Sequence, residues 1–354
     1  MEGRQACLTG RCWGERTGIM NTTLATASSY KDRRTALLVA GVLEIILGAA
    51  AWLMAALMLL GASLAASQGG ARVATMIPGM AVYGVGGVVF VVLGIGSIRA
   101  RRWARALWLV VATSWLMIGI LTLGMMLLML PAMLQGPGGG VPAPPPGVQT
   151  LILAMVLAFM GVLGVALPAG LILFYRSPHV QATCEAENPR ASWTDRSPLP
   201  VLGAAMWLGS MAVALPWMGL VYGGLYPAFG GFARGAFGHS LWVVSGLLSG
   251  LAAFGVFRQS KPLWWLAFGL VIALGASASL TYLVADLRQL YEAMGMGGVQ
   301  LEQIERMGML RPSYMVATTL TAILPLLTLL VWARTCFYPA PPLDSAPATP
   351  GEGA

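Results

Sequence analysis

Residues 36–60 read ALLVAGVLEIILGAAAWLMAALMLL, an apolar run interrupted by a single charged side chain, Glu44. A helix over these 25 residues is about 37 Å long, more than the roughly 30 Å of hydrocarbon in a bilayer. Seven similar runs follow, at 79–98, 106–130, 150–175, 199–222, 241–257, 263–285 and 314–337. Because the runs are continuous and do not alternate polar with apolar residues, they predict helices rather than barrel strands. The sequence therefore predicts an all-α integral membrane protein with eight transmembrane helices.

The composition excludes a soluble domain. Hydrophobic residues make up 57% of the 354 positions and charged residues 10%, and the mean hydropathy is +0.76. Soluble domains carry about 25% charged residues. The formal net charge of +8 belongs to the segments between the apolar runs, so it indicates membrane orientation and contact with lipid head groups rather than nucleic-acid binding. The partner that the composition predicts is the lipid bilayer, with no nucleic acid.

The positive charges between the runs predict the orientation. With the N-terminus inside, sixteen of the 21 basic residues fall on the cytoplasmic side: Arg4, Arg11, Arg16, Lys31, Arg33, Arg34, Arg99, Arg101, Arg102, Arg105, Arg176, Arg190, Arg196, Arg258, Lys261 and Arg334. An excess of Lys and Arg marks the cytoplasmic face because basic loops are disfavoured on the other side. An even number of spans then returns the chain to the same face. We therefore expect both termini in the cytoplasm.

Five segments are predicted along the chain. They are a cytoplasmic, disordered tail at 1–34, a four-helix membrane unit at 35–176, a solvated cytoplasmic connector at 177–198, a second four-helix unit at 199–338 and a Pro-rich disordered tail at 339–354. The first tail lacks the apolar stretch of a secretory signal peptide. Met20 offers a second start after Met1, and which of the two is the true start stays open.

No pattern for catalysis stands out. The chain lacks a His-Glu-x-x-His metal motif, paired intramembrane aspartates and a Gly-x-Ser-x-Gly nucleophile turn. Its four cysteines, Cys7, Cys12, Cys184 and Cys336, all fall on the predicted cytoplasmic side, where thiols stay reduced. We expect no enzyme activity, no cofactor, no metal site and no disulfide.

Several landmarks indicate an internal duplication. Residues 94–103 (GIGSIRARRW) and 254–265 (FGVFRQSKPLWW) are both short basic turns followed by tryptophan. Pro168 and Pro325 stand at matching places near the ends of the two units, and the offset stays near 160 residues. Because each unit has an even number of spans, the copies would be parallel and related by an axis along the membrane normal.

Four stretches carry a family resemblance: 41–48 (GVLEIILG), the Arg-Arg-Trp-Ala-Arg turn 101–105, 174–180 (FYRSPHV) and 193–196 (WTDR). In them the chain resembles uncharacterised bacterial multi-pass inner-membrane proteins built from four-span units. The resemblance implies the bacterial inner membrane as location and implies no activity. The second unit departs from the pattern, because its first span lacks the acid.

Glu44 is the only ionisable residue placed well inside a predicted span. An intramembrane acid costs roughly 2.5–3.5 kcal/mol on insertion scales, so it is expected to face a bundle interior or a wet cavity. Gly41 and Gly48 lie near its helical face and would let another helix approach closely. Its candidate hydrogen-bond partners are hydroxyls of the last two spans: Ser277, Ser279, Thr281, Thr318, Thr319 and Thr321.

Two functions remain open. The leading one is a non-enzymatic structural, assembly or partner-binding membrane component, acting with other membrane proteins or as a homo-oligomer. The alternative is a secondary transporter, or a carrier of lipids or hydrophobic solutes, with parallel repeats and Glu44 as a proton or cation site. A transporter of hydrophilic solutes needs several polar groups in mid-membrane, so one acid and a few hydroxyls favour the first function. As a packing carboxyl, Glu44 should tolerate replacement by Gln with little change in stability.

Overall fold

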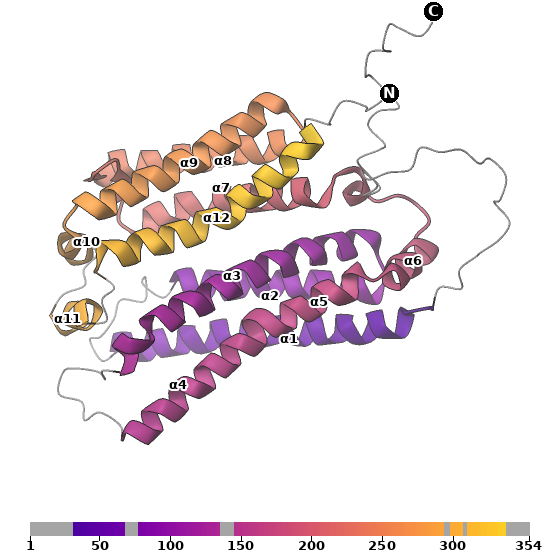
Figure 1. Ribbon diagram of the computed structural model, residues 1–354, viewed down its shortest axis with the longest axis horizontal. Coiled ribbons are helices and arrows are strands. Elements are labelled where there is room, and N and C mark those ends of the chain that lie inside the picture. Colours follow the sequence, from indigo (N-terminus) through magenta and orange to yellow (C-terminus); the bar gives the residue numbers. More distant parts are fainter. Residues whose placement is uncertain (1–30, 68–76, 135–144, 294–297, 307–309, 338–354) are drawn as a thin grey trace, which may run out of the picture.

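The computed structural model describes residues 31–67, 77–134, 145–293, 298–306 and 310–337 (Figure 1). Within these ranges, eight helical segments are long and apolar enough to cross a membrane. They are built from α1 (Arg34–Ser67), α2 (Ile77–Ile98), α3 (Arg102–Leu134), α4 (Pro146–Gly161) with α5 (Leu167–Arg176), α7 (Leu199–Val221), α8 (Gly235–Phe257), α9 (Lys261–Val284) and α12 (Pro312–Phe337). The eight predicted apolar helices are confirmed, and the chain is a helical multi-pass membrane protein. The two predicted tails lie almost wholly outside the described residues, as do Cys7, Cys12 and Met20.

The fourth span is a single rod made of three pieces. α4 passes through a π-helical turn, Val162–Ala166, into α5. Pro168 has no N–H, so it cannot bond the carbonyl of Gly164 four residues earlier, and the turn widens there. Gly164 lies directly against Gly119 of α3, where a side chain on Gly119 would not fit. The widened turn therefore coincides with a backbone-to-backbone contact between the third and fourth spans.

Helices α1 to α5 form the lower group in Figure 1. Glycines bring α1 and α2 together: a Cβ on Gly41 would lie 2.6 Å from the Gly94 carbonyl oxygen, and one on Gly48 would lie 2.8 Å from that of Gly87. This confirms the expected close approach of a helix to the small residues of α1. Helix α3 packs against both α2 and α5, and it joins this group to the upper one.

The upper group consists of α7, α8, α9 and α12 (Figure 1). Its core centres on Trp264, whose indole N–H donates to the Leu330 carbonyl at 3.0 Å and whose ring stacks on Phe268. Helix α12 packs against both α9 and α7, so these four helices close on themselves. The two groups meet where Trp207 of α7 donates to Ser114 of α3 at 2.7 Å.

The turn between α2 and α3 ends α2 in a Schellman motif. Ala100 has a positive φ of 46°, and its N–H donates to the Ser97 carbonyl at 2.9 Å. The Arg101 N–H donates to the Gly96 carbonyl at 2.9 Å, which is the second bond of this motif. A Cβ on Gly96 would lie 2.5 Å from that of Ala104, so the turn brings the start of α3 directly against the end of α2.

The turn between α8 and α9 repeats this construction 159 residues later in the chain. Gln259 has the positive φ (56°) and donates to Val256 at 3.0 Å, and Ser260 donates to Gly255 at 2.9 Å. A Cβ on Gly255 would collide with Leu263. Each of these residues stands at the same offset from its counterpart in the first turn.

The connector at 177–198 is folded, with one side packed on the membrane helices. Its first part is α6 (Pro178–Glu187), which lies at the end of the lower group where α1 begins (Figure 1). Val180 and Cys184 are buried against the membrane helices. The Thr183 hydroxyl accepts the Arg33 N–H at 3.1 Å. The connector is thus packed on one side, while Gln181, Glu185 and Glu187 on its other side are exposed.

A short hairpin, β1 (Tyr226–Ala228) and β2 (Gly231–Ala233), joins α7 to α8. Its two-residue loop has positive φ at both Phe229 (43°) and Gly230 (105°), which is the type I′ geometry of tight hairpins. Ser277 of α9 donates to the Pro227 carbonyl at 2.8 Å and accepts the Phe229 N–H at 3.1 Å. Because Ser277 is seven residues before the end of α9 at Val284, the hairpin folds back about 10 Å along that helix.

At this same end lie two further short helices, α10 (Leu287–Ala293) and α11 (Val299–Arg306). Each buries one leucine, Leu287 and Leu301. The start of α1, the end of α12 and α6 lie together at the opposite end (Figure 1). The bundle thus has one end that carries α6 and another that carries the hairpin, α10 and α11.

Candidate functional site

Glu44 is buried on α1, with 1% of its surface exposed. It faces α2, since a Cβ on Gly94 would lie 3.2 Å from the Glu44 Cβ. Gly94 stands four residues before the end of α2 at Ile98, so Glu44 lies about 6 Å, one helical turn, inside that end. The acid is therefore deep along its own helix, but close to the α6 end of its neighbours.

A tyrosine and a serine complete the cluster. The Tyr175 hydroxyl, from the end of α5, donates to Glu44 Oε1 at 2.5 Å, and Ser97 Oγ of α2 lies 2.7 Å from the same hydroxyl. A tyrosine has one hydroxyl proton, and here it goes to Glu44, so Ser97 donates to the tyrosine oxygen. Three helices are thus joined by one chain of buried hydrogen bonds.

Trp108 of α3 closes the cluster from a third side. Its ring stacks parallel to that of Tyr175, with centroids 6.0 Å apart. Glu44 Oε2 and Trp108 Nε1 are both buried without a hydrogen-bond partner among the described residues. Unpaired buried polar atoms are uncommon, and they distinguish this cluster as the candidate site.

Arginines of the α2–α3 turn hold α6 over the cluster. Arg101 donates to the Asn188 side chain at 2.9 Å, and Arg105 donates to the Tyr175 carbonyl at 2.9 Å and to Gln181 at 3.1 Å. Part of the positive charge that predicts orientation therefore also fixes the end of α5 and the helix that follows it. This keeps the Tyr175 hydroxyl aligned on Glu44.

Cys184 lies on the buried face of α6, in the same buried cluster as Tyr175 and Trp108. Burial raises the pKa of its thiol to about 11, because the charged thiolate is disfavoured away from water. The thiol therefore stays protonated and unreactive at neutral pH.

The six hydroxyls proposed as partners of Glu44 lie on α9 and α12 in the upper group, while α1 is in the lower one (Figure 1). Ser277 and Thr281 bind the hairpin backbone, and Thr318 and Thr319 both donate to the Met315 carbonyl of their own helix. Ser279 and Thr321 are half-buried on the same two helices. The hydrogen bond to Glu44 comes instead from Tyr175, which corrects the expected set.

Tyr175, Ser97 and Trp108 were not among the predicted site residues. Tyr175 precedes Arg176 at the end of its span, and Ser97 precedes the basic turn, so both resemble residues of the membrane interface. The available signal was that all three stand near the same predicted end of the first unit as Glu44.

Comparisons with known proteins found no matching family model, curated protein or solved structure. Among the described residues, no three His, Cys, Asp or Glu side chains gather as metal ligands would. The chemistry that the Glu44 cluster supports is proton exchange along the Ser97–Tyr175–Glu44 chain, or cohesion of the three helices that it joins.

Proposed function

We propose that this chain is a non-enzymatic component of the bacterial inner membrane that binds other membrane proteins or further copies of itself. The observation that carries this proposal is the outer surface of the lower group. The first span contains 31 residues and the fourth contains 30, and only 11% and 6% of their most apolar stretches are buried.

The length of these two helices supports the same role. A helix of 30 residues is about 45 Å long and exceeds the roughly 30 Å of hydrocarbon, whereas the spans of the upper group contain 23 to 26 residues. Such mismatch promotes tilting and helix association. Long apolar helices with little internal packing suit a surface that other transmembrane helices cover.

Photo-crosslinking in native membranes tests the partner-binding role. A crosslinking residue at Leu53 of α1 or Leu151 of α4, 61% and 60% exposed, should give discrete protein adducts. The matched control is Leu247 of α8, 69% exposed on the closed upper group, which should give lipid adducts alone. Lipid adducts alone at all three positions would contradict the proposal, and an adduct of twice the chain mass would identify a homo-oligomer.

We further propose that both termini face the cytoplasm and that the two four-helix units are parallel repeats. The shared Schellman turns, with their constant offset, support the repeat.

Native Cys184 is buried and cannot report orientation. Single cysteines at two exposed positions can report it instead: Ala186→Cys on α6 and Ala236→Cys on α8. The native cysteines are replaced in both variants. An impermeant thiol reagent should label Cys at 236, and not at 186, in intact spheroplasts; the reverse pattern would refute the orientation.

The rival is a transporter or carrier with Glu44 as its proton site. The unpaired Glu44 Oε2 beside the unpaired Trp108 Nε1 favours it. If Glu44 exchanges a proton, a pH jump applied to the purified protein should release more protons from wild type than from Glu44→Gln. Equal proton release from the two proteins would exclude this role and leave Glu44 as a packing group.

A further inference from the structure

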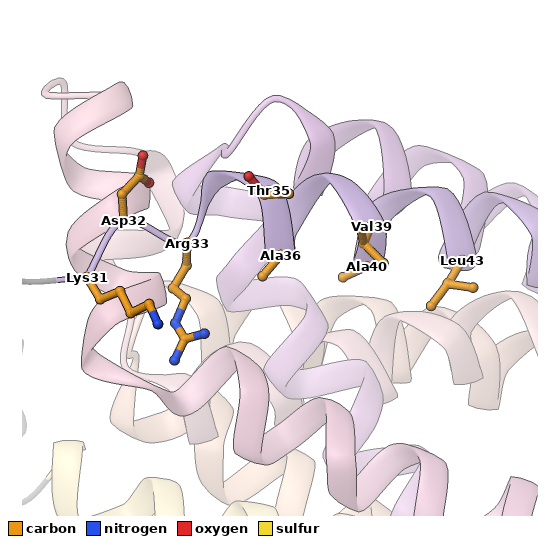
Figure 2. A pocket seen from close by; sticks show the side chains of 8 residues that line it. All are labelled: Lys31, Asp32, Arg33, Thr35, Ala36, Val39, Ala40 and Leu43. Atoms are coloured by element: carbon orange, nitrogen blue, oxygen red, sulfur yellow. The ribbon is translucent and has the colours of Figure 1, made fainter.

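A groove of about 580 Å³ runs along one face of the first turns of α1 (Figure 2). Its volume is within the roughly 300–1,000 Å³ of small-molecule sites. The residues that line it are Lys31, Asp32, Arg33, Thr35, Ala36, Val39, Ala40 and Leu43. The small side chains of Ala36 and Ala40, one helical turn apart, leave the space. The groove is therefore charged at one end and apolar along the rest.

The charged end is built by residues 31–33, which α6 holds in place. The Lys31 N–H lies 3.4 Å from His179 Nδ1, and the Arg33 N–H donates to Thr183 at 3.1 Å. Figure 2 shows the Lys31 and Arg33 side chains together on the side of Ala36. The two cations thus face the groove because of how their backbone is anchored.

The neighbouring charges do not neutralise this pair. The Asp32 carboxylate accepts the Arg34 N–H at 2.9 Å, and its side chain points away from Lys31 and Arg33 (Figure 2). The Arg34 guanidinium pairs with Glu187 of α6 at 2.9 Å. Among the described residues, no acidic side chain forms an ion pair with Lys31 or Arg33. The charged end of the groove is therefore net positive.

The groove also lies at the depth where the head group of a lipid meets its acyl chains. Its cations precede the first span at Arg34, and Leu43 lies within that span. The basic α2–α3 turn and Trp103, a residue type that anchors at head-group depth, lie at the same end. A ligand that matches this order has an anionic group followed by a hydrocarbon chain.

We propose that the groove binds one anionic phospholipid. Its phosphate lies on Lys31 and Arg33 beside the positive end of the α1 dipole, and an acyl chain follows Ala36, Ala40 and Leu43 into the bilayer. This site is independent of the partner-binding role, because it requires no second protein.

Native mass spectrometry of the purified full chain tests the site, with dioleoyl phosphatidylglycerol as the probe. Phosphatidylcholine with the same chains is the neutral comparison, and inorganic phosphate separates head-group binding from free-anion binding. We expect one retained phosphatidylglycerol, little phosphatidylcholine and no phosphate adduct. Lys31→Gln with Arg33→Gln should weaken phosphatidylglycerol binding about 25-fold, at about fivefold for each cation. Equal retention of the two lipids, or a phosphate adduct as stable as the lipid adduct, would overturn the proposal.

Matched variants separate the groove from a diffuse basic surface. Arg99→Gln with Arg176→Gln removes the same charge from exposed positions at the same end and should leave lipid retention unchanged. Ala40→Phe fills the groove and should reduce retention at least tenfold, whereas Ala50→Phe, exposed elsewhere on α1, should not. Equal loss in test and control variants would overturn the site. Lys31→Arg with Arg33→Lys, which keeps the charge, should retain the lipid and show that lost binding is not lost folding.

Discussion

At Glu44, one carboxyl oxygen accepts a hydrogen bond from Tyr175, and the other is buried without a partner among the described residues, as is the indole N–H of Trp108. Tyr175 and Trp108 both carry donors and a carboxyl presents acceptor oxygens, so an acid suits this site better than an amide does. An amide at this position would turn its own N–H groups toward the indole. The expectation that Gln substitutes without effect is therefore replaced by one in which the carboxyl itself matters.

Tyr175→Phe should lower the free energy of unfolding by about 1–3 kcal/mol, because it removes the donor and leaves a buried carboxyl oxygen unpaired. Glu44→Gln should be destabilising in the same range, and the double variant should lose less than the sum because the two groups share one bond. Unfolding by SDS titration in micelles measures these changes. The control is Tyr83→Phe on the exposed face of α2, and a Tyr175→Phe effect no larger than this control would contradict the prediction.

The thiol of Cys184 provides a pH-dependent prediction outside the spans. Its pKa is raised by burial from 9.0 to about 11, so the folded protein keeps this proton between these values while the unfolded chain loses it. The free energy of unfolding should consequently fall as pH rises from 9 towards 11, and Cys184 should contribute no slope below pH 9. Unfolding curves of wild type and Cys184→Ala at pH 8 and pH 10.5 measure the difference. Parallel pH dependence in the two proteins would show that the thiol is not protected.

At the scale of elements, the same turn closes α2 onto α3 and α8 onto α9. In each turn, a glycine near the end of the first helix lets a residue of the second helix pack against it. Gly96 accommodates Ala104, and Gly255 accommodates Leu263, in both cases eight residues later in the chain. The connection between α7 and α8 is built differently. It is a hairpin whose backbone N–H and carbonyl groups form hydrogen bonds with serine and threonine hydroxyls of α9. Irregular backbone at such depth is tolerated where protein covers it.

Gly96→Ala and Gly255→Ala should each destabilise the protein by about 1–3 kcal/mol, because the added methyl group overpacks a contact with the next helix. Gly86→Ala and Gly269→Ala are the controls, since a Cβ at either meets nothing within 4 Å. These controls should be neutral or slightly stabilising, as alanine favours helix. Thermal unfolding in detergent compares the four variants. A large loss at one turn and none at the other would count against the duplication.

Ser277→Ala should destabilise the hairpin by about 1–3 kcal/mol, because it removes two hydrogen bonds, one from the Phe229 N–H and one to the Pro227 carbonyl. Ser210→Ala on α7 is the control, since that exposed hydroxyl bonds the Trp207 carbonyl of its own helix. Hydrogen exchange at 226–233 should accelerate in the first variant and not in the second. Unchanged protection in Ser277→Ala would mean that the hairpin does not depend on α9.

For the whole molecule, the two groups of helices differ in how they are closed. The upper group is closed by the packing of α12 on α7, whereas α1 packs mainly along α2 and leaves much of its outer face uncovered. The α6 end gathers the Glu44 cluster, the basic turns and the lipid groove, while the other end carries the hairpin, α10 and α11 (Figure 1). The proposed partner and lipid surfaces both belong to the more open group.

Hydropathy and helix length are local properties of the chain, so the eight apolar helices and the one buried acid could be predicted from the residues alone. The sequence also predicted the close approach of a helix at Gly41 and Gly48. The partner of Glu44 could be identified only in the folded molecule: it is Tyr175, 131 residues away, and not a hydroxyl of the last two spans. The docking of α6 and the folding back of the hairpin were likewise outside the reach of local patterns. Each depends on contacts between segments that are distant in the sequence, and such contacts leave no periodic signal in it.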